Sequence, residues 1–320
     1  MLTSMLAFRE RFHALHDNVE QFVRGKPEVV RLALTCMFAE GHLLIEDVPG
    51  VAKTSLAKAL AASVSGVFQR IQFTPDLLPS DVTGVEVFNA KTLEFQFRKG
   101  PVFANVLLGD EINRASPKTQ SALLQVMAEQ TVTVGLKTYA APRPFFCVAT
   151  QNSVEHQGTY PLPEAQLDRF LMRTSIGYPA PDVEKEVVAL GIARKAPDPS
   201  TSVMDVEEVA QMIALARTVD VSDQLREYVV NIVSATRQDA ALLRGASPRG
   251  SIALATAAQV VAASHGRPYA TPDDVKSVAE PVLAHRIQLT HQARMEGRTA
   301  AGVVEEILRD GRRVPVPRAG

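Results

Sequence analysis

The chain has 320 residues and a mass of 34.7 kDa, with 46% hydrophobic and 22% charged residues. This composition is that of an ordinary globular protein and argues against a disordered or fibrous chain, while the length predicts two domains or one domain with a large appendage. The 34 basic and 35 acidic residues nearly cancel, which argues against binding to nucleic acid or anionic membranes through bulk charge.

Cysteines and histidines give no sign of a metal centre. Cys36 and Cys147 lie far apart in apolar runs, and His42, His156 and His265 each lack a second ligand at a metal-binding spacing. No apolar run approaches the ~18 residues of a membrane span. Charged residues follow the first apolar residues too closely for a signal-type core. We therefore expect a soluble, cytoplasmic protein.

The N-terminal third predicts two helices, then a strand, a loop and a helix. Apolar residues recur at helical spacing over 5–22, and a second helix is expected over 27–39. His42–Glu46 is typical of a short buried strand, and it leads through the segment DVPGVAKT into another helix. A strand, a glycine-containing loop and a helix in this order form the arrangement that binds phosphate groups.

Four further strands, with helical patterns between most of them, predict a parallel sheet covered on both faces. They are expected at 67–73, 102–108, 144–149 and 170–176. Two β-hairpins interrupt this alternation. One pairs 85–88 with 93–98, and the other pairs 131–134 with 136–139 across Gly135.

The chain changes character after Tyr178. Residues 194–202 (RKAPDPSTS) are typical of a linker, and only helical patterns follow them. Ser247-Pro248 and Thr271-Pro272 each supply an N-cap and a proline at the first helical position. We predict an αβα domain over 1–197, a small all-α domain over 198–312 and a mobile tail over 313–320.

The loop between the first strand and its helix departs from the pattern GxxxxGK[ST] at both glycines, which are Asp47 and Ala52 here. The chemistry needs backbone amides around the phosphates, Lys53 on the β- and γ-phosphates and the Thr54 hydroxyl on Mg²⁺, and none of these requires a glycine. Alanine at position 52 costs about 1–2 kcal/mol if its φ is positive and nothing if it is negative. We assign nucleotide binding to Asp47, Val48, Pro49, Gly50, Val51, Ala52, Lys53, Thr54 and Ser55; the alternative is a plain turn with a solvated lysine.

Polar side chains follow two later strands. Asp110 and Glu111 end the segment NVLLGDE, and Asn152 ends FFCVATQN. Ligands of open parallel sheets bind at the carboxyl ends of the strands. Asp110 suits a Mg²⁺ ligand, Glu111 suits a general base that polarises water, and Asn152 suits contact with water or the γ-phosphate. The alternatives are a solvated loop for the two acids and a turn for the asparagine.

Two arginines complete the candidate site. Arg169 follows a short helix in PEAQLDRF, where it either forms a local salt bridge or reaches a neighbouring subunit. Arg249 lies in the first turn of a helix, where a positive charge opposes the helix dipole. A nucleotide phosphate would supply its anionic partner.

The order of these features resembles that of AAA+ ATPases. The strings DVPGVAKT, DEINRASPKTQSALLQVMAEQ and ATQNSVEHQGTYPLPEAQLDRF resemble the MoxR family, and the resemblance extends from about residue 20 to about 290. It implies an AAA+ αβα parallel-sheet domain with a helical lid, in which the two hairpins are the helix-2 and presensor-1 inserts. The implied roles are Walker A for Lys53 and Thr54, Walker B for Asp110 and Glu111, sensor 1 for Asn152, sensor 2 for Arg249, and trans arginine finger for Arg169 rather than Arg114.

The same resemblance implies ATP and Mg²⁺ as cofactors and a homo-oligomeric ring, commonly a hexamer. It further implies chaperone-like remodelling or maturation of a client protein complex, often the activation of metal enzymes, together with a partner carrying a von Willebrand A domain. Two alternatives stay open. One is an ATP-gated assembly scaffold with negligible hydrolysis, suggested by Ala52, and the other is a magnesium-chelatase-like motor subunit. Near-neutral charge and few aromatic residues disfavour a nucleic-acid motor.

Overall fold

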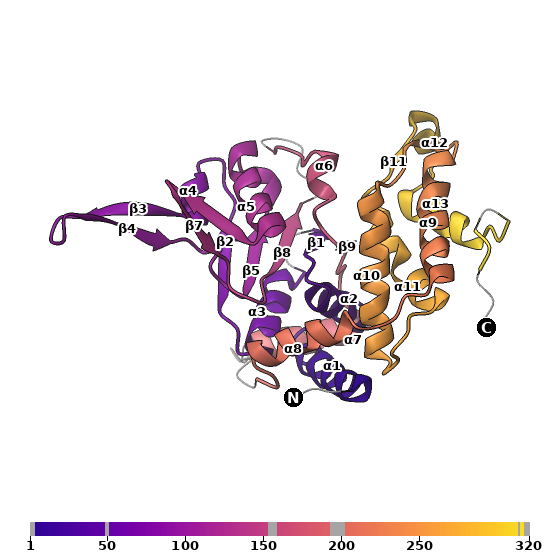
Figure 1. Cartoon of the computed structure of the whole chain (residues 1–320), viewed down its shortest axis with the longest axis horizontal. Coiled ribbons are helices and arrows are strands. Elements are labelled where there is room, and N and C mark those ends of the chain that lie inside the picture. The colour runs from indigo at the N-terminus through magenta and orange to yellow at the C-terminus, as the bar shows by residue number, and fades with distance from the viewer. Residues whose placement is uncertain (1–3, 49–50, 153–158, 193–201, 313, 317–320) are drawn as a thin grey trace. The chain divides into compact units, whose positions relative to one another are not determined.

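The computed structural model describes residues 4–48, 51–152, 159–192, 202–312 and 314–316 (Figure 1). The chain divides into two compact units. The sheet unit comprises Ala14–Arg169 and Thr174–Ala210, and the helical unit comprises Met1–His13, Phe170–Arg173 and Gln211–Gly320. Residues 194–201 of the expected linker (194–202), and residues 313 and 317–320 of the expected tail, lie outside the described residues, so the domain boundaries stay predictions.

A five-stranded sheet with the order β2-β5-β8-β1-β9 is the centre of the fold. The pairs β1–β8, β5–β8 and β2–β5 are parallel, and the register places Glu46 beside Gln151 and Gln72 beside Asp110. These strands therefore end at one edge of the sheet. Their bounds are β1 (Leu43–Glu46), β2 (Phe68–Gln72), β5 (Val106–Asp110), β8 (Phe146–Gln151) and β9 (Met172–Thr174).

All five expected strands are present, and β5 shows the largest shift in its starting residue. The pattern begins at Val102, whereas β5 begins at Val106. The buried side chain of Asn105 explains the difference, because its Oδ1 accepts from Val67 N (3.0 Å) and its Nδ2 donates to the Pro144 carbonyl (3.0 Å). Asn105 thus aligns the starts of three segments before the ladder begins.

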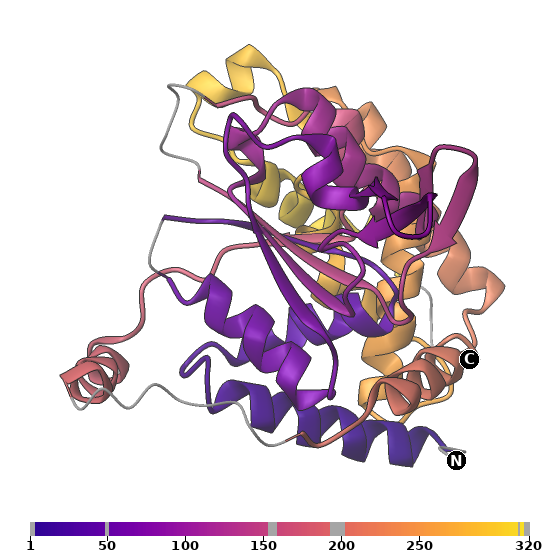
Figure 2. The same ribbon diagram turned by 90° about the vertical axis from the view of Figure 1, so that its left-hand side faces the viewer.

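Helices cover both faces of the sheet, which is why its central strands are continuous apolar runs. Leu43, Leu44 and Ile45 of β1 are fully buried. Right-handed crossovers in opposite directions along the sheet place α3 and α5 on opposite faces (Figure 2). The helices of this part of the chain are α1 (Met5–Glu20), α2 (Pro27–Phe38), α3 (Lys53–Ser63), α4 (Pro79–Thr83), η1 (Ile112–Arg114), α5 (Pro117–Glu129), α6 (Glu164–Leu167), α7 (Pro181–Ile192) and α8 (Val206–Ala216).

Both predicted hairpins are present, and they contact each other. The first is β3 (Gly84–Asn89) with β4 (Glu94–Lys99), and the second is β6 (Thr131–Val134) with β7 (Lys137–Ala140). Phe97 of β4 stacks on Tyr139 of β7 with ring centroids 4.3 Å apart. Farther along the same face, Phe88 and Phe95 pack together but remain exposed. The first hairpin extends away from the sheet (Figure 1).

The helical unit contains a bundle, as predicted, together with one short antiparallel strand pair that the sequence did not indicate. Ser247 caps α10 by accepting from Arg249 N (3.2 Å), and the side chain of Asp274 closes the start of α11 by accepting from Thr271 N (2.7 Å). The elements are α9 (Asp223–Gln238), β10 (Leu242–Arg244), α10 (Pro248–Ser264), α11 (Pro272–Leu283), β11 (Gln288–Leu289), α12 (His291–Met295) and α13 (Ala300–Arg309). None of the described helices combines the length and the apolar character needed to cross a membrane.

Candidate functional site

Lys53 is the first residue of α3 and lies at the edge where the parallel strands end. Its side chain is 9% exposed, and its Nζ donates to the Asp47 carbonyl at 2.9 Å. Burial lowers the pKa of Lys53, and the charges of Asp47, Asp110 and Glu111 oppose that shift. The lysine and the two strand-end acids therefore lie close enough to interact electrostatically. This proximity is what the sequence predicted from the strand order.

The residue before Lys53 has a left-handed backbone. Ala52 has φ +58° and ψ 18°, so the sequence alternative in which alanine carries strain is the one observed. A non-glycine residue in this region costs about 1–2 kcal/mol relative to glycine. In this conformation the chain turns directly into α3, whose free N-terminal amides form an anion site. Pro49 and Gly50 of the predicted loop lie outside the described residues.

Asp47 stabilises the start of the loop from within the chain. Its Oδ2 accepts from the backbone amides of Ile176 and Gly177, both at 2.6 Å, and its Oδ1 accepts from Val48 N at 2.8 Å. The side chain is 8% exposed. The carboxylate thus joins the end of β1 to the segment after β9, while its own carbonyl holds Lys53.

Asp110 and Glu111 are linked through Thr150 of β8. The Thr150 hydroxyl donates to Asp110 Oδ1 (2.6 Å) and accepts from Glu111 N (2.9 Å). Glu111 has φ +56°, a second left-handed non-glycine residue. The strand therefore ends at Asp110.

Three further side chains from β2 and η1 contact these acids. Arg70 Nη2 donates to Asp110 Oδ2 at 2.6 Å. Gln72 Nε2 and Arg114 Nη1 each donate to Glu111 Oε2 at 2.9 Å. Arg114, the second candidate for an arginine finger, therefore pairs with an acid of its own chain here.

The remaining predicted residues occupy three different settings. Asn152 follows β8 and is 7% exposed, and its carbonyl accepts from Asn113 Nδ2 at 3.4 Å. Arg169 is exposed, and its Nη1 donates to the Leu124 carbonyl at 2.7 Å. Arg249 lies in the exposed first turn of α10 in the helical unit.

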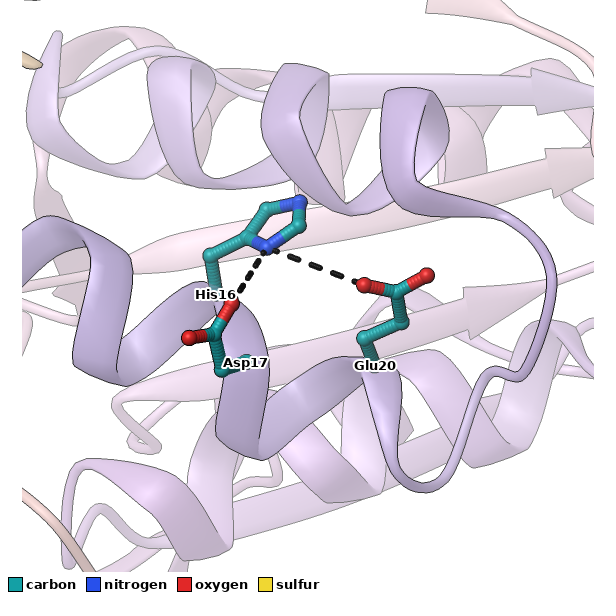
Figure 3. Close-up of side chains that lie close together, drawn as sticks. All are labelled: His16, Asp17 and Glu20. Atoms are coloured by element: carbon teal, nitrogen blue, oxygen red, sulfur yellow. Dashed lines mark hydrogen bonds and ion pairs between the residues drawn. The ribbon is translucent and has the colours of Figure 1, made fainter.

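The donor set fits a magnesium nucleotide. A buried lysine and a helix N-terminus attract phosphate charge. The Thr54 hydroxyl in the first turn of α3 and the Asp110 carboxylate are hard oxygen donors, which Mg²⁺ prefers. Among the described residues, the one group of three or more potential metal-ligating His, Cys, Asp or Glu side chains lies elsewhere, on α1 (Figure 3). There, His16 Nδ1 lies 3.3 Å from Asp17 Oδ1 and 3.9 Å from Glu20 Oε2, an arrangement that an ordinary surface ion pair explains.

Sequence reasoning missed Thr150, Arg70 and Gln72. Gln72 ends β2, but the expected strand over 67–73 ends on Phe73, so the rule that identified Asp110 and Asn152 passes over Gln72. Thr150 and Arg70 lie within strands, where threonine and exposed arginine are ordinary. Only the register of β2, β5 and β8 brings them to the acids.

Fold and site together define a P-loop nucleotide-binding protein with a helical lid. Residues 42–172 match the ATPase family associated with various cellular activities (AAA), and residues 234–307 match the AAA lid domain. A crystal structure of a candidate ATPase from Cytophaga hutchinsonii superposes with a TM-score of 0.90 at 38% identity, covering 98% of this chain and 97% of that one.

Three relatives agree with this class. Chaperone MoxR1 of Mycobacterium tuberculosis is 41% identical over 91% of this chain and 79% of its own length. The uncharacterised protein YeaC of Bacillus subtilis is 46% identical over 98% of this chain and 99% of its own length. Protein MoxR of Paracoccus denitrificans is 31% identical over 88% and 89% of the two chains. The chain belongs to the MoxR family of AAA+ ATPases.

Proposed function

We propose that the protein hydrolyses ATP to ADP and phosphate in a homo-oligomeric ring and uses the released energy to remodel or mature a partner protein complex. The observation that supports hydrolysis best is the electrostatic proximity of Lys53 to Asp110 and Glu111 at the edge where the parallel strands end. A cation for the phosphates, a metal-binding acid and a second acid for water are the groups that this reaction requires.

Each of the candidate site residues has a separate task in this proposal. Lys53 and the free amides of α3 hold the β- and γ-phosphates. Thr54 and Asp110 would hold the Mg²⁺ that accompanies ATP, and this ion would neutralise charge on the phosphate oxygens. Glu111 polarises the attacking water and takes up its proton. Asn152 orients that water.

Two arginines act on charge that develops during the reaction. Arg249, which lies in the helical unit, binds a phosphate of the nucleotide. Its positive charge opposes the dipole at the start of α10, and the phosphate would offset this unfavourable interaction. Arg169 stabilises the transition state in a neighbouring subunit, and its exposed position beyond α6 leaves it accessible to that neighbour. Removing a trans arginine of this kind costs about 10³–10⁵ in rate.

The remodelling part of the proposal rests on the family and on the hairpins. MoxR1 is named a chaperone, and the exposed Phe88 and Phe95 on β3 and β4 give an apolar surface suited to a protein client. We propose a six-subunit ring in the cytoplasm that works with a partner carrying a von Willebrand A domain. Insertion of a metal cofactor into a client is one form that such maturation takes.

Steady-state ATP hydrolysis with Mg²⁺, measured across protein concentration, tests this proposal. We expect specific activity to rise as subunits associate. Glu111→Gln should bind ATP with unchanged affinity and turn over at least 100-fold more slowly, because it retains the shape but loses the base. Glu129→Gln, an exposed substitution at the end of α5, is the matched control and should turn over at the wild-type rate.

An ATP-gated scaffold is the competing function, and one observation favours it. The Oε2 atom of Glu111 is already engaged by Gln72 and Arg114 in this structure. A scaffold predicts ATP-dependent assembly in both the wild type and Glu111→Gln, without turnover in either. Hydrolysis by the wild type alone would exclude the scaffold.

A further inference from the structure

One buried backbone carbonyl receives two side-chain hydrogen bonds from the segment at the end of α11. His285 Nε2 lies 3.0 Å from the Phe170 oxygen, and Arg286 Nη2 lies 2.6 Å from the same oxygen. Arg286 Nη2 also lies 3.4 Å from the Leu171 carbonyl. A carbonyl has two lone pairs, and both are engaged here. The backbone at Phe170 and Leu171 is thereby fixed to α11 within the helical unit.

The two donors differ in charge but are both firmly placed. Burial lowers the pKa of His285 well below its ordinary value, so its ring is neutral and Nε2 carries the hydrogen that the carbonyl accepts. Arg286 keeps its charge, and its Nε donates to the Val282 carbonyl one turn earlier (2.8 Å). The guanidinium is therefore anchored to its own helix at one side and to the chain at Phe170 at the other.

The residue before Phe170 is Arg169. Fixing the backbone of Phe170 fixes the point from which the Arg169 side chain extends. An error of about 1 Å in the position of a catalytic group costs on the order of 100-fold in rate. Any displacement of the Phe170 carbonyl therefore also displaces the backbone atoms of Arg169.

Arg286 also packs on the helix that carries Arg249. Helices α10 and α11 lie side by side, and Gly250, directly after Arg249, is buried. A Cβ at Gly250 would lie 3.6 Å from Arg286 Cδ, in ordinary contact. One arginine side chain therefore lies beside Gly250 in the first turn of α10 and donates to the carbonyl next to Arg169.

We propose that Arg286, assisted by His285, is a positioning residue for Arg169 that connects it to the helical turn carrying Arg249. This inference rests on the proposed function, in which Arg169 acts on the neighbouring subunit. A displacement of the first turn of α10 when Arg249 meets phosphate then reaches Arg169 through Arg286. Nucleotide bound by one subunit thereby sets the activity of the next site in the ring.

Single substitutions give the first test. Arg286→Ala should lower ATP turnover about 100-fold and leave ATP affinity, measured by isothermal titration, within about threefold of wild type, since it leaves Lys53 and Thr54 intact. Arg286→Lys retains a donor and should recover part of the rate. Arg309→Ala is the control: it removes an exposed arginine of the same unit that pairs with Glu305, and it should leave turnover unchanged.

Mixed assemblies then show whether the defect acts on the neighbour. Arg286→Ala subunits keep Glu111, and Glu111→Gln subunits keep Arg169 with its support. A 1:1 mixture should hydrolyse ATP faster than the sum of the separate variants. A Lys53→Ala and Glu111→Gln mixture, defective at the same site, should remain inactive. Arg169→Ala mixed with Glu111→Gln is the reference for a lost finger.

The outcomes separate the inference from the function on which it rests. If the Arg169→Ala mixture is active and the Arg286→Ala mixture is inactive, or if Arg286→Ala alone turns over like wild type, Arg286 does not position the finger. If the Arg169→Ala mixture is itself inactive, the finger assignment fails and this inference fails with it. Should Arg286→Ala not fold, Arg286→Lys takes its place in the mixtures and must show a rate defect that Glu111→Gln subunits restore.

Discussion

Ala52→Gly should stabilise the sheet unit, although glycine normally weakens a protein. The backbone at Ala52 is left-handed, with φ +58°, and alanine there costs about 1–2 kcal/mol relative to glycine. Glycine also gives the unfolded chain more freedom, which offsets about 0.4–1 kcal/mol of this gain. The difference predicts a net increase of about 0–1.6 kcal/mol in the free energy of unfolding, with a central value near 0.8 kcal/mol.

A matched alanine-to-glycine substitution shows whether the sign of the stability change at Ala52 comes from its left-handed backbone. Ala122 lies in the middle of α5, where φ is that of an ordinary helix, so Ala122→Gly should lower stability by about 1 kcal/mol. Urea unfolding followed by circular dichroism, without nucleotide, compares the two variants. ATP turnover of Ala52→Gly should equal or exceed that of the wild type, because the conformation is the one glycine adopts freely. Equal destabilisation by both glycines would show that Ala52 carries no strain and that our account of the loop is wrong.

Three other substitutions test the site and the core. Thr150→Val removes the hydroxyl that joins Asp110 to the Glu111 amide and should lower turnover about tenfold with ATP affinity unchanged, whereas Thr150→Ser should retain activity. Asp47→Ala leaves three backbone amides without their acceptor and should cost on the order of 3 kcal/mol of unfolding free energy; a cost below 1 kcal/mol in urea unfolding would contradict this. Burial lowers the pKa of His42 from 6.5 to about 4. The contribution of His42 to the free energy of unfolding is therefore complete above pH 6.5 and falls by about 3 kcal/mol as the pH drops to 4, because only the unfolded chain takes up the proton over that range. His42→Gln should flatten the pH dependence of the free energy of unfolding between pH 6.5 and 4.

The parts of the site that lie at strand ends could be predicted from the sequence. Asp110, Glu111 and Asn152 each follow a continuous apolar run, and parallel strands of one sheet share an edge. Lys53 follows from the strand, loop and helix order, even though both loop glycines are replaced. The positions of these residues could be predicted because they depend on the direction of each strand and not on exact register, whereas their roles stay predictions.

Contacts that depend on register or on tertiary packing could not be predicted. Arg70 reaches Asp110 because β2 pairs with β5, two strands separated in the sequence by a hairpin insert. The carbonyl at Phe170 accepts from His285 and Arg286, more than a hundred positions later. No periodicity or motif marks a backbone carbonyl as a partner, and a single sequence contains nothing that joins these positions.

Asp110 and Glu111 form ion pairs with arginines of their own chain, but these pairs are weak compared with the free energy of nucleotide binding and do not weigh against hydrolysis. Arg70 and Arg114 are 46% and 41% exposed in their pairs with Asp110 and Glu111, and exposed ion pairs contribute about 0–1 kcal/mol each. A micromolar affinity for nucleotide corresponds to about 8 kcal/mol, which is several times the contribution of both pairs together. Binding can therefore displace these arginines. The chemical step is different, because a missing trans arginine raises its barrier by about 4–7 kcal/mol. Under the proposed role of Arg169, whether this chain is an ATPase or a scaffold depends more on the delivery of Arg169 to the neighbouring site than on the altered loop.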